Sequence, residues 1–219
     1  MNYKELKTEV DQVRSSVNKL LNIFTERALN DLRIRRYSKV VDIFDFNKRD
    51  NPNIQTSSDF FSIFREEVGV YLFEANFEDY YERWFEKISF RNLEELKKIW
   101  FEEIERLWSG IDKSPAFYKR RAGYHFVNEQ TNKFQGGWVP LYVGKSKNIQ
   151  SRVYEHIEGL SPKTYGMKLR HREKLKKSGI KFRVSYSPLD ELDDEILYEL
   201  VKVVENKIRA KYNPIIGKQ

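Results

Sequence analysis

The chain has 219 residues, 40% of them hydrophobic and 33% charged, which is enough apolar material for one large domain or two small ones. The absence of cysteine excludes disulfides, thiolate metal sites and a cysteine nucleophile, and three histidines argue against a multi-histidine zinc site. The charged opening residues do not form a signal peptide and no apolar run reaches membrane-spanning length, so we expect no membrane partner and a cytoplasmic, nucleoid-associated protein.

The net charge of +7 is unevenly distributed. Residues 1–113 hold 19 Lys and Arg against 22 Asp and Glu, a balance of −3, whereas residues 114–219 hold 21 against 11, a balance of +10. A polyanion such as nucleic acid is the natural partner of so basic a half, although a soluble basic surface alone would give the same balance.

Residues 3–30 carry apolar side chains at intervals of three and four, which predicts an amphipathic helix. These positions are Leu6, Val10, Val13, Val17, Leu20, Leu21 and Phe24. Residues 31–45 either continue the helix or form a basic extended segment. Residues 47–58, rich in Asn, Asp, Ser and Pro, predict a loop.

Residues 59–108 return to helical spacing, with aromatic residues in a pattern typical of a core. Asn92 followed by Glu95 resembles a capping box, and Gly110 ends the last of these helices. The sequence therefore predicts an all-α N-terminal region over residues 1–113.

The pattern changes from helix to strand after the turn at residues 109–113. Residues 122–127 and 139–143 are short extended-looking runs joined by a polar, glycine-containing loop, which predicts a hairpin. A helix beginning near Ser146 or Lys147 is expected to follow.

Three further elements complete the second half. A strongly basic segment covers residues 163–177, residues 180–186 alternate as a third strand, and residues 190–212 predict a long helix with an acidic first turn. The resulting order, β-β-α-α-β-α, predicts a small α/β domain over residues 114–219.

Residues 140–156 combine a strand, a glycine turn and a basic helix, which indicates a site that handles phosphate. Phosphodiester cleavage needs a positive group, a base or bound hydroxide, and usually a carboxylate-held metal. Arg152 offers a fork of donors that matches phosphate oxygens, and His156 lies one turn later on the same face. Tyr142 ends the strand and Lys145 lies on the turn.

Glu205 supplies a candidate carboxylate. It lies between Val204 and Ile208 on the apolar side of the last helix, where a carboxylate needs a partner such as a metal ion. An ion pair with Lys202 or Arg209 would also satisfy it.

Two other kinds of site do not fit. A P-loop requires a glycine where Val139 stands, so Gly144-Lys145-Ser146 predicts no nucleotide cofactor. A glycosidase-like pair of carboxylates is poorly supported, because the acidic residues of the second half cluster on one helical turn.

Three blocks occur in the order of a known family. They are Gly123-Tyr124, the run Tyr142-Val143-Gly144-Lys145-Ser146-Lys147-Asn148-Ile149-Gln150-Ser151-Arg152-Val153, and Glu205. Together they resemble the GIY-YIG nucleases, most closely the restriction endonucleases of that family, over about residues 120–216. Ala122-Gly123-Tyr124 departs from Gly-Ile-Tyr by one position, and Gly217 stands where the family often has an asparagine after a proline.

The resemblance implies a three-stranded antiparallel sheet flanked by helices and a metal-dependent DNA endonuclease. Tyr124 would act as or near the general base, and Tyr142 would shape the site around the attacking water. Arg152 would contact the scissile phosphate, and Glu205 would hold one Mg²⁺ or Mn²⁺. Simpler structural interpretations also exist: strand aromatics for the tyrosines, and an ion pair with a nearby glutamate for Arg152.

Lys145 and His156 correspond to site residues of the restriction-enzyme branch, although His156 could equally be structural. This branch implies a site-specific type II restriction enzyme that acts on double-stranded DNA as a homodimer. The region 1–113 would then supply dimer contacts or base readout, and the sequence leaves both open. Backbone phosphates would be contacted by the basic residues Lys147, Lys168, Arg170, Arg172 and Lys174. The alternatives are a repair or mobile-element nuclease and a non-cleaving nucleic-acid-binding protein of the same fold.

Overall fold

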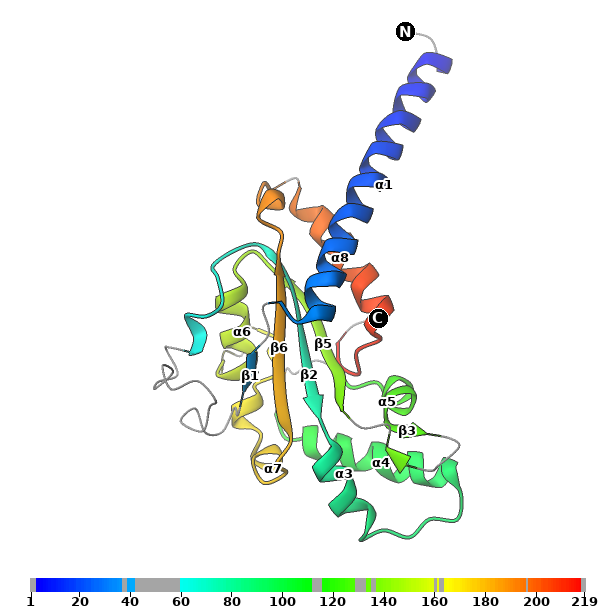
Figure 1. Cartoon of the computed structure of the whole chain (residues 1–219), viewed down its shortest axis with the longest axis vertical. Coiled ribbons are helices and arrows are strands. Elements are labelled where there is room, and N and C mark those ends of the chain that lie inside the picture. Colours follow the sequence, from blue (N-terminus) through cyan, green and yellow to red (C-terminus); the bar gives the residue numbers. More distant parts are fainter. Residues whose placement is uncertain are drawn as a thin grey trace.

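The fold is organised around one antiparallel sheet, whose long strands run vertically in the computed structural model of Figure 1. The structure describes residues 3–36, 39–41, 60–111, 116–128, 133–134, 137–159, 161, 164–195 and 197–217. The main sheet has the strand order β1-β6-β2-β5, and a separate two-stranded ladder pairs β3 with β4. The strands are β1 (Lys39–Val41), β2 (Gly69–Asn76), β3 (Val127–Asn128), β4 (Lys133–Phe134), β5 (Trp138–Ser146) and β6 (Lys181–Pro188).

Seven α-helices lie among the described residues. They are α1 (Tyr3–Ile34), α3 (Glu78–Phe85), α4 (Leu93–Trp108), α5 (Lys119–Phe126), α6 (Ile149–Ile157), α7 (Glu173–Lys176) and α8 (Tyr198–Tyr212). Two short 3₁₀ turns, η1 (Leu169–His171) and η2 (Asp190–Leu192), precede α7 and α8. The predicted cap of α4 is confirmed, because the Asn92 side chain accepts a hydrogen bond from the Glu95 amide at 2.9 Å.

Helices cover both faces of β2. Val70 and Leu72 pack with the apolar residues of α1 and α8, whereas Tyr71 and Phe73 face the cluster that contains residues of α4 and α6. Successive side chains of a strand point to opposite faces, so a strand buried on both sides needs a continuous apolar run. Residues 69–73 supply an unbroken run of glycine and apolar residues, and every residue of β2 except Asn76 is buried.

The predicted all-α N-terminal region is therefore wrong. β2 comes from the first half of the chain and is hydrogen-bonded to both β5 and β6 of the second half. A short run buried on both faces has no period of two, and its apolar residues also fit helical spacing. The sheet consequently spans the boundary expected at residue 113.

The predicted hairpin is also wrong. Residues 119–126 form helix α5 instead of a strand, and β5 pairs with β2. The strands expected near 139–143 and 180–186 are confirmed as β5 and β6. The final helix is confirmed over Tyr198–Tyr212 as α8, but it begins later than expected, because Asp190–Leu192 form the separate 3₁₀ turn η2. The loop expected at residues 47–58 lies outside the described residues.

Helix α1 extends far beyond the sheet in Figure 1. Its burial begins at Leu21, and from there Phe24, Ala28 and Leu32 pack against the body of the protein. Residues 3–20 are exposed along their whole length, so the apolar stripe expected to face a core does so only in its last part. In the part of the chain that is described, no helix combines the length and hydrophobicity needed to cross a membrane.

A buried ion triad fastens the end of α1 to the sheet. The Glu74 carboxylate on β2 is 1% exposed and pairs with Arg35 through one oxygen and with Arg183 of β6 through the other, at 2.5 and 3.0 Å. Burial raises the pKa of Glu74, and the two guanidinium groups oppose that shift. Two cations around one carboxylate hold three chain segments together.

Candidate active site

The β2–β5 pair brings two tyrosines together. Tyr71 of β2 lies opposite Gly144 of β5, and its ring stacks on Tyr142 with the ring centroids 6.1 Å apart. A Cβ at residue 144 would lie 2.3 Å from the Tyr71 hydroxyl oxygen, so only glycine leaves room for this hydroxyl. The glycine of the Tyr-Val-Gly sequence is thus explained by the tyrosine on the neighbouring strand.

Helix α6 presents the next two side chains. The Asn148 side chain caps it by accepting a hydrogen bond from the Ser151 amide at 2.8 Å, and the Ile149 amide donates to the Glu67 carbonyl oxygen at 3.1 Å. With its start fixed, the helix presents Arg152 and His156, four residues apart, on the side that faces Tyr71.

His156 is fully buried and its protonation is set by its two partners. Its Nδ1 accepts a hydrogen bond from the Met167 amide at 3.1 Å, so in the neutral ring the proton is on Nε2. Nε2 lies 2.9 Å from the Tyr71 hydroxyl oxygen and therefore donates to it. Burial, and then the Arg152 charge, hold the pKa of His156 well below its ordinary value, so the ring stays neutral.

Tyr71 is held in its protonated form at neutral pH. Burial raises its pKa well above 10, the nearby Tyr142 adds to this, and the positive charge of Arg152 acts in the opposite direction. A tyrosine with this pKa can orient a water molecule by hydrogen bonding, but it is a weak proton acceptor at pH 7.

Arg152 carries the positive charge of this face. Its guanidinium pairs with Glu155 one turn along α6, and a second nitrogen donates to the Tyr165 carbonyl oxygen at 3.5 Å. Burial acts to lower the pKa of Arg152, but Tyr71 and Glu155 together raise it above its ordinary value. The ion pair with a nearby glutamate, one of the simpler interpretations, is therefore present, and Arg152 also faces the tyrosines.

Glu205 approaches the site from α8. It is 9% exposed, and burial raises its pKa while Arg209 and then Lys145 lower it. One carboxylate oxygen, Oε1, accepts a hydrogen bond from Arg209, whose guanidinium also donates to the Val143 carbonyl oxygen at 2.8 Å. Lys145 lies in the same region, with its Nζ 3.8 Å from the centre of the Tyr198 ring.

A divalent cation fits this region only if it shares the Glu205 carboxylate with Arg209. Among the described residues, no three His, Asp or Glu side chains gather as a metal-binding group. Mg²⁺ often binds through one or two carboxylates, with water and substrate phosphates as its other ligands. Glu205 is such a carboxylate, and Arg209 engages its Oε1. The metal would have to share Glu205 with Arg209.

The C-terminal segment is hydrogen-bonded to the edge of β5 that does not pair with β2. The Ile215 and Ile216 amides donate to the Pro140 and Leu141 carbonyl oxygens at 3.1 and 2.9 Å. Gly217 follows with φ +105°, and a Cβ there would lie 3.0 Å from the Tyr142 ring. The position where the family often has an asparagine thus lies directly against the site, and its backbone favours glycine.

Tyr124 does not occupy the position predicted for it. It is on α5 and 74% exposed, and its described ring contact is with His125. The hydroxyl that the structure places beside Tyr142 and His156 is that of Tyr71, which sequence reasoning missed. The signal was present, because Gly69-Val70-Tyr71 differs from Gly-Ile-Tyr by one methylene group.

Two of the basic residues predicted to contact DNA are buried and cannot do so. Arg172 is 1% exposed, donates to the Met167 carbonyl oxygen at 2.8 Å and lies over the Trp108 ring, and burial lowers its pKa to about 10. Lys168 is 5% exposed and has a left-handed backbone with φ 53°. Both residues shape the turn before α7.

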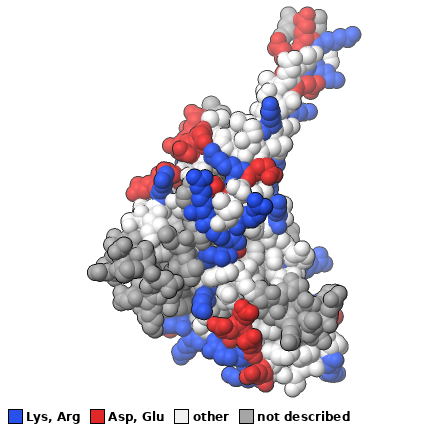
Figure 2. Space-filling model, in the orientation of Figure 1, with Lys and Arg blue, Asp and Glu red and all other residues white. Residues whose placement is uncertain are grey.

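The other three basic residues remain accessible to differing extents. Lys147 and Lys174 are exposed, and Arg170 is partly exposed and paired with Glu158. Figure 2 shows Lys and Arg side chains gathered across the middle of the face seen there, next to acidic groups.

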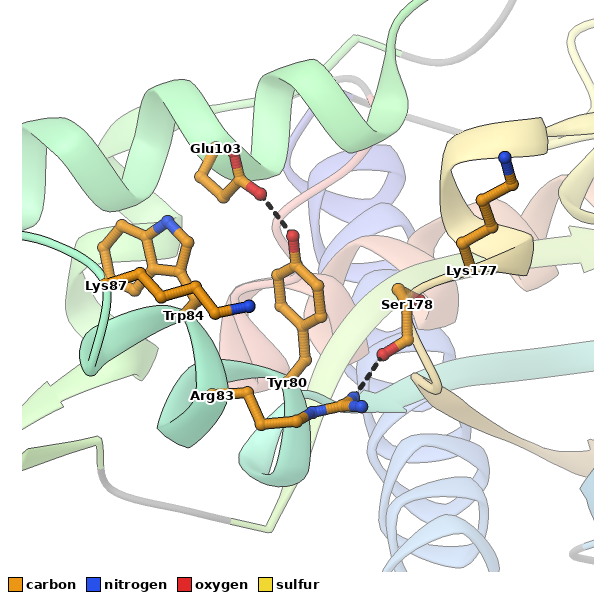
Figure 3. A pocket seen from close by; sticks show the side chains of 7 residues that line it. All are labelled: Tyr80, Arg83, Trp84, Lys87, Glu103, Lys177 and Ser178. Carbon is orange, nitrogen blue, oxygen red and sulfur yellow. Dashed lines mark hydrogen bonds between the residues drawn. The ribbon is translucent and has the colours of Figure 1, made fainter.

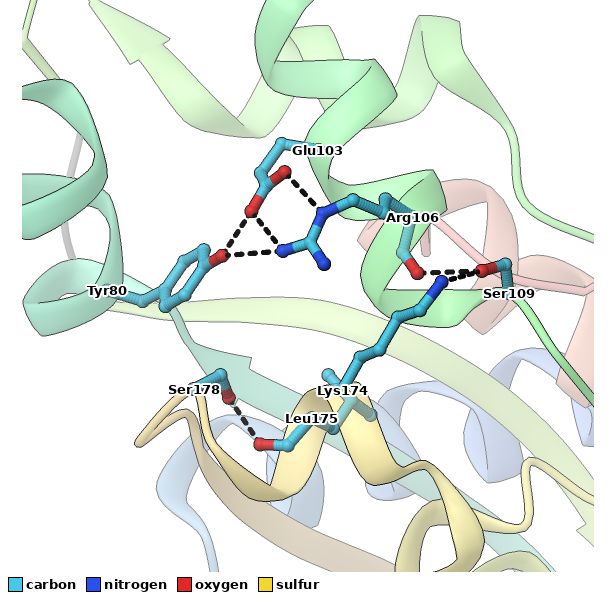
Figure 4. Close-up of polar contacts among 7 residues, drawn as sticks. All are labelled: Tyr80, Glu103, Arg106, Ser109, Lys174, Leu175 and Ser178. Carbon is cyan, nitrogen blue, oxygen red and sulfur yellow. Dashed lines mark hydrogen bonds and ion pairs between the residues drawn. The ribbon is translucent and has the colours of Figure 1, made fainter. Parts of the chain in front are cut away.

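A pocket of about 310 Å³ has none of the candidate site residues in its lining (Figure 3). It is lined by Tyr80, Arg83, Trp84, Lys87, Glu103, Lys177 and Ser178. Figure 4 shows that Glu103 accepts hydrogen bonds from both Tyr80 and Arg106. Burial, aided by Glu103, raises the pKa of Tyr80 to about 12, while Arg106 lowers that of Glu103.

This pocket lies where α3, α4 and α7 are linked by hydrogen bonds. Arg83 of α3 donates to the Ser178 carbonyl oxygen at 2.7 Å, and Lys174 of α7 donates to the Ser109 hydroxyl at 2.9 Å. These contacts tie α3, α4 and α7 together, so we assign the pocket a structural role.

Comparisons with protein-family models, curated proteins and solved structures found no match for this chain. The site is therefore interpreted from its own geometry.

Proposed function

We propose that this protein is a metal-dependent DNA endonuclease of the GIY-YIG type. The observation that carries the proposal is the convergence of Tyr71, Tyr142, His156 and Arg152 across the β2–β5 pair, with Glu205 nearby on α8. A Gly-Val-Tyr strand paired with a Tyr-Val-Gly strand is a more specific arrangement than either sequence alone.

In phosphodiester hydrolysis, Arg152, the Tyr71–His156 pair and Glu205 would each have a separate role. Arg152 stays charged at any working pH, so it can bind the scissile phosphate and stabilise the negative charge that develops on it. Neutral His156 donates to the Tyr71 oxygen, which leaves the proton of Tyr71 free to orient the attacking water. Mg²⁺ bound at Glu205 would supply Lewis-acid stabilisation of the phosphate. Burial raises the pKa of Glu205, and the charges of Arg209 and then Lys145 oppose that rise and favour the ionised carboxylate that a metal needs.

Plasmid cleavage tests the proposal. Purified protein with supercoiled plasmid and Mg²⁺ should produce nicked or linear DNA. Arg152→Ala and Glu205→Ala should each reduce the rate by roughly 10²-fold or more while DNA binding is retained. Tyr71→Phe should reduce it by a similar factor, whereas Tyr124→Phe should leave it unchanged. Equal activity of all four variants would refute the assigned site.

Site specificity is a further part of the proposal. A type II restriction enzyme would yield discrete fragments whose ends map to one sequence, and cuts confined to flaps or junctions would indicate a repair nuclease instead. Binding should weaken steeply with salt, because the exposed cations displace counterions from the DNA.

A non-cleaving nucleic-acid-binding protein is a second candidate, favoured by one observation. Arg209 already neutralises Glu205, which is the carboxylate needed for the metal. Tight DNA binding with no cleavage in Mg²⁺ or Mn²⁺ would establish this candidate. Activity gained in Arg209→Ala would then show that the ion pair blocks the metal.

A further inference from the structure

The projecting part of α1 carries a continuous exposed apolar stripe. It consists of Tyr3, Leu6, Val10, Val13, Val17 and Leu20, named here the α1 seam. These side chains are between 37% and 81% exposed. Figure 1 shows this part of the helix standing clear of the sheet and of α8. A helix with a stripe of this kind normally buries it against another element.

The spacing of the α1 seam is that of a coiled coil. Successive members are three, four, three, four and three residues apart, which is the a and d pattern of a heptad. Tyr3, Val10 and Val17 occupy a positions, and Leu6, Val13 and Leu20 occupy d positions. The b, c and f positions are all polar: Lys4, Glu5, Thr8, Asp11, Gln12, Ser15, Asn18 and Lys19.

We propose that the α1 seam pairs with the same seam of a second copy of this chain, forming a parallel two-stranded coiled coil. The residue types favour two strands, because β-branched residues at a with Leu at d select parallel dimers. Val10 and Val17 are the β-branched a residues, and two of the three d residues are Leu. A two-fold axis along the stalk makes the interface self-complementary.

The charges beside the seam favour the parallel orientation. Glu9 is at a g position and Arg14 at the following e position, and both are exposed. In a parallel pair a g residue faces the e residue five positions later on the other helix, so Glu9 meets the partner's Arg14 twice by symmetry. An antiparallel pair would instead bring Lys7 near the partner's Arg14, and both are positive.

The coiled coil ends where α1 docks on the body. Phe24 would be the next a residue, but it is 8% exposed and packs with the α8 side of the sheet. The pairing therefore spans residues 3–20 and joins two bodies at the same end of the stalk. It does not depend on the nuclease proposal, since no residue of the α1 seam belongs to the candidate site.

Sedimentation of the full chain tests the interface. The wild type should be a dimer, and the double variant Val10→Lys, Val17→Lys should dissociate at concentrations at least tenfold higher than the wild type does. The matched control Thr8→Lys, Ser15→Lys adds the same charge at two f positions and should remain dimeric. Thermal melting should show the body intact in every variant, because residues 3–20 contact no core. A monomeric wild type, or seam and control variants that behave alike, would overturn the proposal.

Disulfide trapping tests the orientation. The chain has no cysteine, so a single introduced thiol reports one contact. Leu6→Cys should cross-link to itself under mild oxidation, and Thr8→Cys on the outer face should not. Cross-linking of Leu6→Cys to Val17→Cys, with none between two Leu6→Cys chains, would overturn the parallel arrangement. Glu9→Lys should weaken the dimer, and adding Arg14→Glu should restore it.

Discussion

At the scale of single residues, Gly144 shows how one missing side chain sets the site. A methyl group there would lie 2.3 Å from the Tyr71 hydroxyl and 2.8 Å from the Tyr142 ring. We expect Gly144→Ala to displace Tyr71, to cost about 1–3 kcal/mol of stability and to reduce cleavage by roughly 10²-fold. Urea unfolding and the rate of plasmid cleavage measure the two effects.

Gly123→Ala is the matched control for that change. Its Cβ would meet the tip of the Phe101 ring, which is a side chain and can move. The control should therefore keep full activity. Loss of activity in Gly123→Ala, with Gly144→Ala active, would instead support the prediction that Ala122-Gly123-Tyr124 belongs to the active site.

His156 makes stability depend on pH. Its pKa in the folded protein is lowered well below 6.5, so below that pH the unfolded chain binds the proton more readily. The free energy of unfolding should fall by up to about 1.4 kcal/mol per pH unit as the pH drops below 6.5. His156→Gln removes this proton and should show a shallower decline between pH 7 and 5 in urea titrations. Identical slopes would contradict a buried neutral ring.

At the scale of elements, the sequence predicted those whose residue types follow a regular period. The helices α1, α4 and α8 have a period of 3.6 because one side of each is polar, and β6 alternates between large apolar residues and small or charged ones. β2 lacks such a period, since both of its faces are covered, and it was included in a helix. Its misassignment also hid Tyr71, although Arg152, His156 and Glu205 were placed from spacing within single helices. Register between distant strands cannot be read from local pattern.

The ion triad that fastens α1 provides a test at this scale. Glu74→Ala leaves Arg35 and Arg183 near each other without their carboxylate, and we expect a loss of about 3–5 kcal/mol. Glu191→Ala breaks the more exposed pair with Arg27 and should cost less than about 1 kcal/mol. Denaturant unfolding compares the two. Equal losses would show that the triad contributes no more than a surface pair.

At the scale of the whole molecule, the sheet makes both halves of the chain interdependent. In the order β1-β6-β2-β5, the strands β5 and β6 do not touch and are joined through β2. A fragment of residues 114–219 lacks β2, so we expect it to show no cooperative unfolding transition by circular dichroism. Adding residues 60–113 should restore one. A fragment 114–219 that folds alone would confirm the domain boundary expected from the sequence.

The central position of β2 also has a consequence for synthesis. β2 is complete at residue 76, but its neighbours end only at residues 146 and 188. Until β6 has left the ribosome, the apolar strand β2 has at least one edge without its hydrogen-bonding partner strand. An unpaired strand edge favours aggregation. Translation speed and chaperone supply should therefore affect the soluble yield of this protein more than that of one whose strands pair in chain order.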